Sequence, residues 1–311
     1  MKPASLSRPL ASSVRQQGLA LIIAMLIAAL AAAVAVSVAT AQSQWLAQVD
    51  HRRDQVEAQS IALAGVQWAR AIVDADARGI DHLGEPWALP LPATPVENGE
   101  VEGRIVDAQA MLNVNNLAGA QHGALERRRF TRLFATLGIP DTTLASIVDW
   151  VDADDVPQQG GAEDAWYAGE ADPSLAANGP ATRIEELALV RTMTAQALAR
   201  IVPFVTSLPP DTPVNVNTAA PEVLAALLDG IDGGALAALV ASRHDHPFAS
   251  QEDFRGRLPT GVTVIDPDLI AVSTGYFFVT VRARQGETIA QARALIHRDN
   301  ASSAIVWQTI E

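Results

Sequence analysis

The chain has 311 residues, a formal net charge of −13 at pH 7 and no cysteine. The length fits one or two domains, and the absence of cysteine excludes disulfides and thiol chemistry. The negative charge has the wrong sign for a protein that holds the phosphate backbone of a nucleic acid. Composition alone does not indicate a function, so the function has to be inferred from individual segments.

The first predicted element is an apolar helix over Leu19–Ala41. At a rise of about 1.5 Å per residue it spans about 34 Å, enough to cross a hydrocarbon core of about 30 Å. Lys2, Arg8 and Arg15 precede it, and no acidic residue occurs before Asp50. Because positive flanks stay in the cytoplasm, we expect a single membrane span with an exported C-terminal part.

A cleaved secretory signal is the alternative, since Ala39-Thr40-Ala41 has the form of a signal-peptidase site. The apolar region of such signals usually covers only about 7–15 residues, which favours a retained anchor. Under the alternative the mature chain would be a free periplasmic protein. The mature mass distinguishes the two, because cleavage after Ala41 removes the anchor.

The helix is predicted to continue from Gln42 to about Ala77, with no glycine or proline before Gly65. The span and this segment together predict one long rod, and a plain stalk between anchor and domain is its simplest interpretation. Large apolar residues recur at helical spacing and are expected to form one apolar face: Leu46, Val49, Val56, Leu63 and Val66.

Strands are predicted on both sides of a helical block, and the proline-rich run Glu85–Gly99 is expected only to connect the long helix to them. Each strand alternates apolar and polar residues, over Glu100–Ala108, Thr274–Gln285, Thr288–Asp299 and Ala304–Ile310. The fold class is therefore α+β: a long N-terminal helix, an antiparallel sheet and a large inserted helical domain.

Two segments of the helical block repeat one pattern: "LNVNNLAG" at Leu112–Gly119 and "VNVNTAAPEVL" at Val214–Leu224. Each precedes an apolar helix, a glycine followed by isoleucine, and a second apolar helix. The alternating asparagines are expected to satisfy nearby backbone groups or to cap the next helix; they are Asn113, Asn115, Asn215 and Asn217.

The second copy resembles a helix-hairpin-helix module. In DNA-binding members of that family the glycine-rich hairpin offers backbone N–H groups to phosphate. Here the hairpin Gly230–Gly234 contains Asp232, and the stretch 213–256 has six acidic residues against two arginines. We expect a packing unit. The alternative is a membrane-anchored DNA-binding protein of the competence type, which salt-sensitive micromolar binding in a gel-shift assay would support.

Acidic residues are densest in Asp149–Asp172, where 8 of 24 residues are Asp or Glu and none is basic. Such crowding repels itself unless a cation lies within it, and carboxylate oxygens suit Ca²⁺. Pro157 and Gly160-Gly161 allow the chain to turn back, which predicts four calcium ligands: Asp152, Asp154, Glu163 and Asp164.

The segment is not an EF-hand. Glu163 falls at the twelfth position counted from Asp152, but Pro157 occupies the sixth position, where that motif requires glycine. A solvated acidic loop is the alternative. The aromatic residues Trp150, Trp166 and Tyr167 lie among the acids and favour an ordered, packed loop.

An enzyme is not indicated. The usual nucleophile, phosphate-loop and zinc-protease motifs are absent from the sequence, and the histidines are scattered. The acids could serve as general acid and base, but without a partner base they indicate an ion site. We expect no catalytic residue and no cofactor except calcium.

The N-terminus resembles a type IV prepilin, with a short basic leader, "QQGL" at Gln16–Leu19 and an apolar half-helix. The resemblance implies that a prepilin peptidase cuts between Gly18 and Leu19 and that the new N-terminus is methylated. In that family the fifth mature residue is usually Glu, which neutralises the N-terminal amine of a neighbouring subunit. Here it is Ile23, which implies a filament position with no subunit ahead.

The order of three later motifs resembles the minor pseudopilin K family of type II secretion, also called general secretion pathway protein K. The motifs are the acidic segment 149–167, "NGPATRIEELALV" at Asn178–Val190, and Val214–Leu224. The resemblance implies calcium in the acidic loop and a pseudopilin sheet with a helical insertion. It also implies a place at the pseudopilus tip, supporting protein export across the outer membrane.

The resemblance divides the chain into a leader (1–18), an N-terminal helix (19–77, membrane span 19–41), a pseudopilin sheet domain (78–108 and 272–311) and an inserted helical domain (109–271). The implied partners are other minor pseudopilins, the prepilin peptidase and the inner membrane, with secreted substrates as a further candidate and no nucleic acid. The C-terminal domain is expected in the bacterial periplasm.

Overall fold

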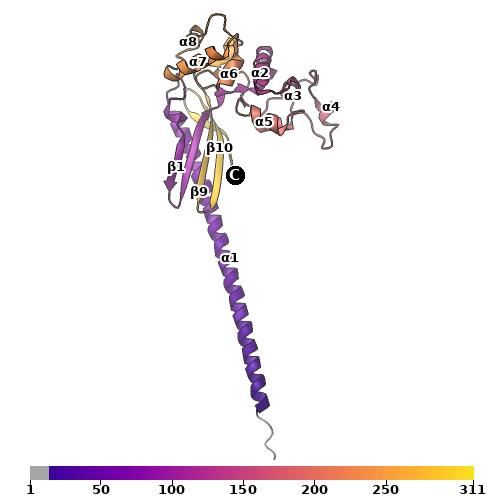
Figure 1. The fold of residues 1–311 in the computed structure, drawn as a ribbon, viewed down its shortest axis with the longest axis vertical. Coiled ribbons are helices and arrows are strands. Elements are labelled where there is room, and N and C mark those ends of the chain that lie inside the picture. Colours follow the sequence, from indigo (N-terminus) through magenta and orange to yellow (C-terminus); the bar gives the residue numbers. More distant parts are fainter. Residues whose placement is uncertain (1–13) are drawn as a thin grey trace, which may run out of the picture.

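A single long helix, α1 (Val14–Ala75), leads into the rest of the molecule. The structure is a computed structural model that describes residues 14–311, with side chains from Gly18 onward, so most of the expected leader lies outside the described residues. Figure 1 shows α1 extending as a rod beyond the other elements. From Gly18 the helix is long and apolar enough to cross a membrane.

The upper part of α1 packs on a five-stranded antiparallel sheet with the strand order β1-β2-β9-β10-β11. The strands are β1 (Leu91–Val96), β2 (Gly99–Asp107), β9 (Tyr276–Gln285), β10 (Thr288–Arg298) and β11 (Ser303–Ile310). Alternate residues of β9 form the core under the helix, and Phe277, Val279 and Val281 among them are almost fully buried. The predicted strands on both sides of the helical block thus belong to one sheet.

The helix face that meets the sheet consists of small residues: Ala58, Ala62, Val66, Ala69 and Val73. Gly65 lies so close that a Cβ atom there would be 2.7 Å from Cγ1 of Val281. The apolar face that the sequence predicted from larger residues is not the face that packs on the sheet. Of its five members only Val66 is buried, whereas Leu46, Val49 and Val56 remain exposed.

The proline-rich run contains a strand that the sequence did not predict. Strand β1 pairs with β2 through a tight turn in which Asn98 has a φ of 60°. Pro92 and Pro95 fit there because β1 is an edge strand, where a missing backbone N–H costs little. A short 3₁₀ helix, η1 (Pro86–Ala88), precedes it and buries Trp87.

The block between β2 and β9 is a helical insertion with a hydrophobic core of its own. Its helices are α2 (Gly123–Leu137), α3 (Asp141–Val151), α4 (Asp164–Tyr167), α5 (Ala195–Ile201), α6 (Pro221–Leu227), α7 (Gly233–Asp245) and α8 (Gln251–Gly256). Four short 3₁₀ helices belong to the same block: η2 (Ala108–Ala110) and η3 (Val114–Ala118) before α2, η4 (Ile184–Leu189) between α4 and α5, and η5 (Pro267–Leu269) after α8.

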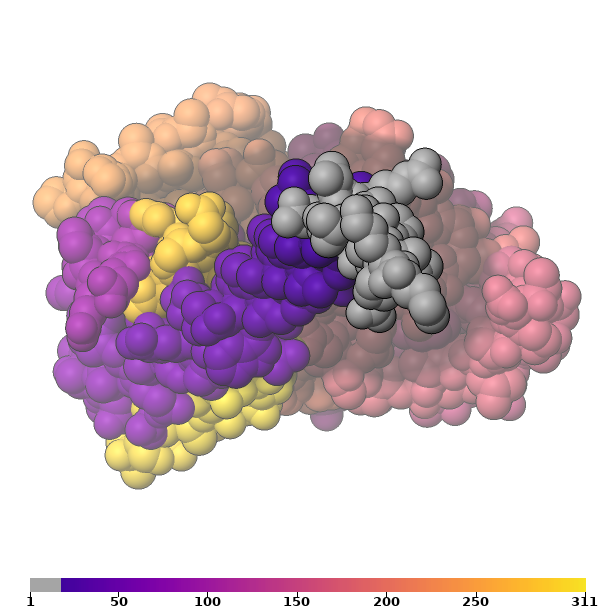
Figure 2. Space-filling view, turned by 90° about the horizontal axis from the view of Figure 1, so that it is seen from below, coloured from indigo at the N-terminus to yellow at the C-terminus, as the bar shows by residue number. Residues whose placement is uncertain are grey.

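The insertion lies at the end of the sheet away from the free part of α1 (Figure 1). Figure 2, seen from below, shows its pink part, about residues 150–200, extending to one side, away from β1 and β2. Three two-stranded pairs join its segments: β3 (Leu112–Asn113) with β4 (Val205–Thr206), β5 (Val214–Asn215) with β8 (Ile270–Ala271), and β6 (Leu228–Asp229) with β7 (Thr263–Val264).

The two repeated segments have matching structures, since β3 and β5 each form a parallel pair with a strand from later in the insertion. The side chain of Asn115 accepts from the N–H of Ala181 (2.8 Å) and donates to its carbonyl (2.9 Å). Asn217 makes the same two bonds to Phe248, at 2.8 and 3.0 Å. The expected bonds to nearby backbone groups belong to Asn113 and Asn215, which accept from the N–H groups of Asn115 and Asn217 at 3.2 and 3.0 Å. Asn115 and Asn217 instead satisfy backbone groups that are distant in sequence.

Candidate metal centre

The acidic segment forms a loop between α3 and α4. Helix α3 ends at Val151, and Asp152 follows with an extended backbone. Gly160 has a φ of +87°, and a Cβ atom on Gly161 would be 1.9 Å from a carboxylate oxygen of Asp149. Both glycines are thus required, the first by its conformation and the second by close approach, and together they turn the chain back toward α3.

Three of the four predicted ligands converge. Asp152, Asp154 and Glu163 each place a carboxylate oxygen within 4.8 Å of the others. Asp152 and Glu163 are buried, at 9% and 4% exposure, while Asp154 is exposed. The cluster is therefore open on the side of Asp154 and closed on the side of the protein core.

The buried carboxylate oxygens at this cluster lack hydrogen-bond partners. Within the described residues, Oδ1 of Asp152 and both carboxylate oxygens of Glu163 are buried without any donor. Buried polar groups are normally paired, and an unpaired buried carboxylate is costly. An unsatisfied set of oxygen atoms that face one another is the arrangement that a hard cation stabilises.

Burial, and to a smaller extent mutual repulsion, raises the pKa values of the clustered carboxylates. Burial raises the pKa of Glu163 to about 7, and the negative charges of Asp149, Asp152 and Asp154 act in the same direction. Burial likewise raises the pKa of Asp152 to about 6, with repulsion from Asp154 next. A cation bound among these oxygens would favour their charged forms.

The fourth predicted ligand, Asp164, lies outside the three-carboxylate cluster. Its Oδ1 accepts a hydrogen bond from the N–H of Ala176 at 2.8 Å, which holds the next part of the loop. Asp149, which was not among the predicted ligands, lies beside the cluster and accepts from the N–H of Gln158 at 3.0 and 3.1 Å. Burial raises the pKa of Asp149 too.

Aromatic side chains hold the loop in place. Tyr167 stacks edge-on against Trp150 and Trp166, with ring centroids 5.3 and 4.9 Å apart. Arg191 lies 5.0 Å over the Trp166 ring and donates to the carbonyl of Gly161 at 2.9 Å. The predicted packed loop is therefore present, and the alternative of a freely solvated acidic segment does not describe it.

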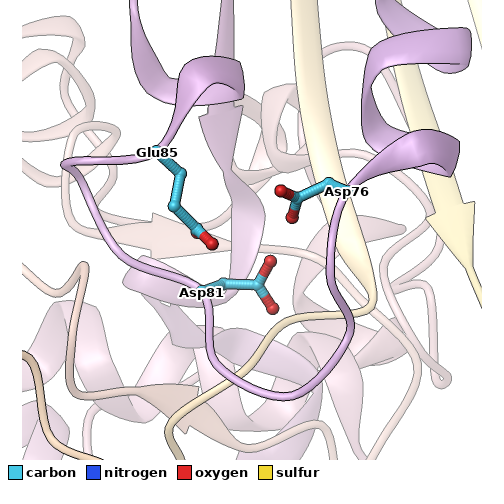
Figure 3. Close-up of side chains that lie close together, drawn as sticks. All are labelled: Asp76, Asp81 and Glu85. Carbon is cyan, nitrogen blue, oxygen red and sulfur yellow. The ribbon is translucent and has the colours of Figure 1, made fainter.

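A second group of carboxylates, Asp76, Asp81 and Glu85, meets in the connection between α1 and the sheet (Figure 3). Arg298 already neutralises it, because its guanidinium lies 3.0 Å from Asp76 and 2.6 Å from Asp81. Glu85 in turn accepts from the indole N–H of Trp87 at 2.8 Å. This group is an ion-pair network, and the oxygens of Asp152, Asp154 and Glu163 are the better cation ligands.

In the hairpin of the second repeat, the N-terminus of α7 is already capped by a carboxylate and does not offer a phosphate site. Asp232 caps α7 by accepting the N–H of Ala235 at 2.8 Å. Its carboxylate therefore occupies the helix N-terminus, where a phosphate group would otherwise bind. This geometry agrees with the acidic composition of the segment.

The residues predicted for processing and filament position lie at the start of the described side chains. A Cβ atom added to Gly18 would meet nothing within 4 Å beyond its chain neighbours and the helix backbone. Leu19 and Ile23 are 61% and 48% exposed on α1. All three are thus accessible along the apolar part of the helix.

Comparisons with known proteins agree on one family. Two family models, both described as type II secretion system protein K, match residues 110–210 and 214–273. Type II secretion system protein K of Pseudomonas aeruginosa is 36% identical over 241 residues, covering 73% of this chain and 72% of the relative. The protein of that name from Klebsiella pneumoniae is 30% identical over 312 residues, covering 94% and 95%.

A solved structure has the same fold. It is a chain of the GspK-GspI-GspJ complex from the enterotoxigenic Escherichia coli type 2 secretion system. The TM-score is 0.70 at 22% sequence identity, over 86% of this chain and 99% of that one.

Proposed function

This chain belongs to the type II secretion system protein K family, and we propose that it is the minor pseudopilin that caps the tip of the pseudopilus. Members of this family are structural components of the secretion apparatus and not enzymes. The observation that carries the proposal is the position of the insertion. It lies beyond the end of the sheet farthest from the membrane span (Figure 1), where a further subunit would have to stack.

The N-terminal helix supports an inner-membrane anchor, since its first half is apolar and none of its described residues is buried. We propose one span, Leu19–Ala41, with the N-terminus in the cytoplasm and the remaining chain in the periplasm. The prepilin peptidase cuts between Gly18 and Leu19. A bulky residue in place of Gly18 should leave an uncleaved, membrane-retained precursor, whereas a free form that begins at Gln42 would contradict the proposal.

Partner subunits are proposed to bind along α1. The related Escherichia coli chain was solved with GspI and GspJ, and on this chain Leu46, Val49 and Val56 are exposed on α1. A second apolar surface is a groove of about 480 Å³ between α1 and β1–β2, which Trp68 and other apolar residues line. Exposed apolar surface on this scale marks protein interfaces.

The test of capping mixes the exported part, from about residue 43, with the exported parts of candidate minor pseudopilins. A defined complex with one copy of each supports the cap. Replacing Leu46, Val49 and Val56 together with serine should weaken that complex without lowering the melting temperature. Homopolymers of this chain, or its incorporation along whole fibres, would contradict the proposal.

We propose that Ca²⁺ binds through Asp152, Asp154 and Glu163, supported by their unpaired buried oxygens. Calcium at about 100 times its dissociation constant should stabilise the fold by about 2.7 kcal/mol. Glu163→Gln, which keeps the side-chain shape, should remove that gain and change little in a chelator. Asp172→Asn, an exposed acid of the same segment, serves as the control.

Asp164 was predicted as the fourth ligand, and Asp164→Asn decides its role. A calcium affinity reduced as much as in Glu163→Gln supports direct ligation. Destabilisation that is equal with calcium and with chelator assigns Asp164 to its bond with Ala176 alone.

Two finer points of architecture belong to the same proposal. The sheet domain (78–108 and 272–311) and the inserted domain (109–271) are proposed as separate folding units, supported by their separate hydrophobic cores. The two asparagine-marked segments are proposed as helix-hairpin-helix-like repeats used for packing, supported by their matching parallel strand pairs.

A further inference from the structure

The sheet face opposite α1 contains a groove that the capping proposal does not use. Along β9, Phe277 and Val279 point into the core under α1, so the alternate residues Phe278 and Thr280 point to the other face. Between this face and the insertion lies a hollow of about 430 Å³, and Val202 of the insertion lines its far side. A second hollow of about 380 Å³ continues it toward β1, sharing Arg104 and Thr280 with the first.

The floor of the groove is apolar and aromatic. The rings of Phe278 and Trp307 lie 6.2 Å apart, centroid to centroid. Val106 and Val202 add further apolar surface and are 39% and 40% exposed. The guanidinium of Arg183 covers the Trp307 ring at 4.5 Å. A side chain that lies on this floor would contact two rings and leave water.

The groove is basic although the chain carries a net charge of −13. Four arginines and two glutamates line the two hollows. Arg282 is paired with Glu102 at 3.3 Å, and Glu185 lies 3.5 Å from Arg183 and 3.8 Å from Arg293. The remaining arginine is Arg104.

Arg104 is the centre of this surface. It lines both hollows, is exposed, and forms no ion pair or side-chain hydrogen bond with any residue from 18 to 311 for which side chains are described. A free guanidinium beside an apolar floor can bind a carboxylate through two parallel N–H bonds.

We propose that this groove, named here the Arg104 groove, binds an acidic segment of another protein that carries an apolar side chain next to its carboxylates. The apolar residue lies on Phe278 and Trp307, and a carboxylate pairs with Arg104. The groove faces away from α1, so it can be occupied while α1 contacts partner subunits. The proposal goes beyond the capping function and does not depend on it.

Other classes of partner fit the groove less well. A bilayer cannot reach it. Helix α1 leaves the membrane at about Ala41 and first meets the sheet where His51 contacts Thr288, about 15 Å further along the helix. The groove residues Arg282 and Thr280 lie further along β9, away from this end of the sheet. A nucleic acid needs several phosphate contacts, whereas the groove offers one free arginine and the chain repels polyanions. A protein segment matches both the charge and the apolar floor.

The test uses the full chain in detergent micelles and fluorescein-labelled peptides of about eight residues, long enough to cross the strands of the sheet. The probe peptide places one phenylalanine among aspartates. One matched peptide replaces the aspartates by asparagine, and another replaces the phenylalanine by serine. Anisotropy gives each dissociation constant.

We expect Arg104→Gln to weaken binding of the probe about tenfold, as for loss of a charged hydrogen-bonded pair. The matched control is Arg284→Gln, on the same face but paired with Glu100 at 3.0 Å and outside the groove; it should change affinity less than about twofold. Val202→Ser should weaken the probe but not the serine peptide. Thermal melting verifies that each variant is folded.

Several outcomes would overturn the proposal: no saturable binding, equal binding of the asparagine peptide, or equal loss in the Arg104 and Arg284 variants. Competition by free glutamate or inorganic phosphate at the concentration of the peptide would show an anion site only, and would also overturn it. Formation of the pseudopilin complex is measured separately, so its failure and the failure of the groove are distinguishable.

Discussion

Arg298 is the basic residue around which the connection between α1 and the sheet is organised. Its guanidinium, 2% exposed, contacts Asp76 and Asp81, donates to the carbonyl of Thr274 at 2.9 Å and covers the ring of Phe277 at 4.8 Å. Asp81 in turn accepts the backbone N–H of Thr274 at 2.8 Å. One side chain thus joins the end of α1 to strands from the opposite end of the sequence.

Replacing Arg298 with methionine should lower the free energy of unfolding by about 3–5 kcal/mol, because it leaves the buried carboxylate of Asp81 without a cationic partner. Urea denaturation measures the effect. The control Arg282→Met removes the exposed pair with Glu102 and should cost less than about 1 kcal/mol. The double variant with Asp81→Asn should recover part of the loss; full additivity would mean that the pair is not coupled.

His122 connects the start of α2 to η5. Its Nδ1 lies 2.8 Å from Oδ2 of buried Asp266, and this hydrogen bond raises the pKa of His122 above its ordinary value of 6.5. Because the pKa is raised in the folded state, the contact contributes fully below the unfolded value and is lost as pH rises through the folded value.

The stability difference between the wild type and His122→Gln should therefore be larger at about pH 6 than at about pH 9. Urea denaturation at both pH values measures it. His244→Gln, at an exposed position of α7, corrects for other groups that titrate in this range. A difference that stays constant or grows with pH would show that the ion pair does not form.

At the scale of elements, the two asparagine-marked segments hold the insertion together. Asn115 and Asn217 each bind both backbone groups of a residue far away in sequence, Ala181 and Phe248. Asn115→Ala and Asn217→Ala should each destabilise the insertion by about 1–3 kcal/mol, since buried backbone groups lose their partners. Asn300→Ala, at an exposed position, should have almost no effect. Effects confined to one copy would contradict the equivalence of the repeats.

The sequence predicted well those elements whose signal is local. The uninterrupted α1 follows from the absence of proline and the presence of only two glycines, Gly18 and Gly65, over Val14–Ala75. Strands β9 and β10 follow from alternation and the turn at Gly286, which has a φ of 53°. Strand β1 was missed because prolines normally argue against strands, and only its edge position accommodates them. The face of α1 under the sheet was missed because alanines carry little hydrophobic signal.

The candidate metal centre was predictable in part for the same reason. Asp152, Asp154 and Glu163 lie in one dense acidic segment, so their convergence needed only a loop that turns back. Asp164 lies outside the cluster and bonds to the N–H of Ala176, a residue beyond the acidic segment, so the sequence of that segment could not predict this bond. The role of Arg298 could not be predicted, since more than 200 residues separate it from Asp76 and Asp81.

At the scale of the whole molecule, the insertion begins and ends at neighbouring points of the sheet. Asp107, the last residue of β2, lies opposite Phe277 near the start of β9. The chain thus leaves the sheet and returns to it at adjacent positions. A short turn could join these two strands directly, which would leave the sheet and α1 as a small pilin-like unit.

A variant with a four- or five-residue turn in place of the insertion, a length usual for hairpins, should keep α1 packed on the sheet, because that core contains no residue of the insertion. Cooperative thermal unfolding and retained protection of β9 and β10 amides from hydrogen exchange would show this.

The same variant tests what excludes the chain from fibre interiors. If the insertion blocks stacking, and Ile23 also fails to neutralise a neighbouring amine, then only deletion combined with Ile23→Glu should raise the number of copies per fibre, counted by quantitative immunolabelling. Ile23→Glu alone should not, because a subunit stacked above would still meet the insertion. Fibre incorporation of the full-length Ile23→Glu variant would show that the charge, and not the insertion, sets the position of this subunit.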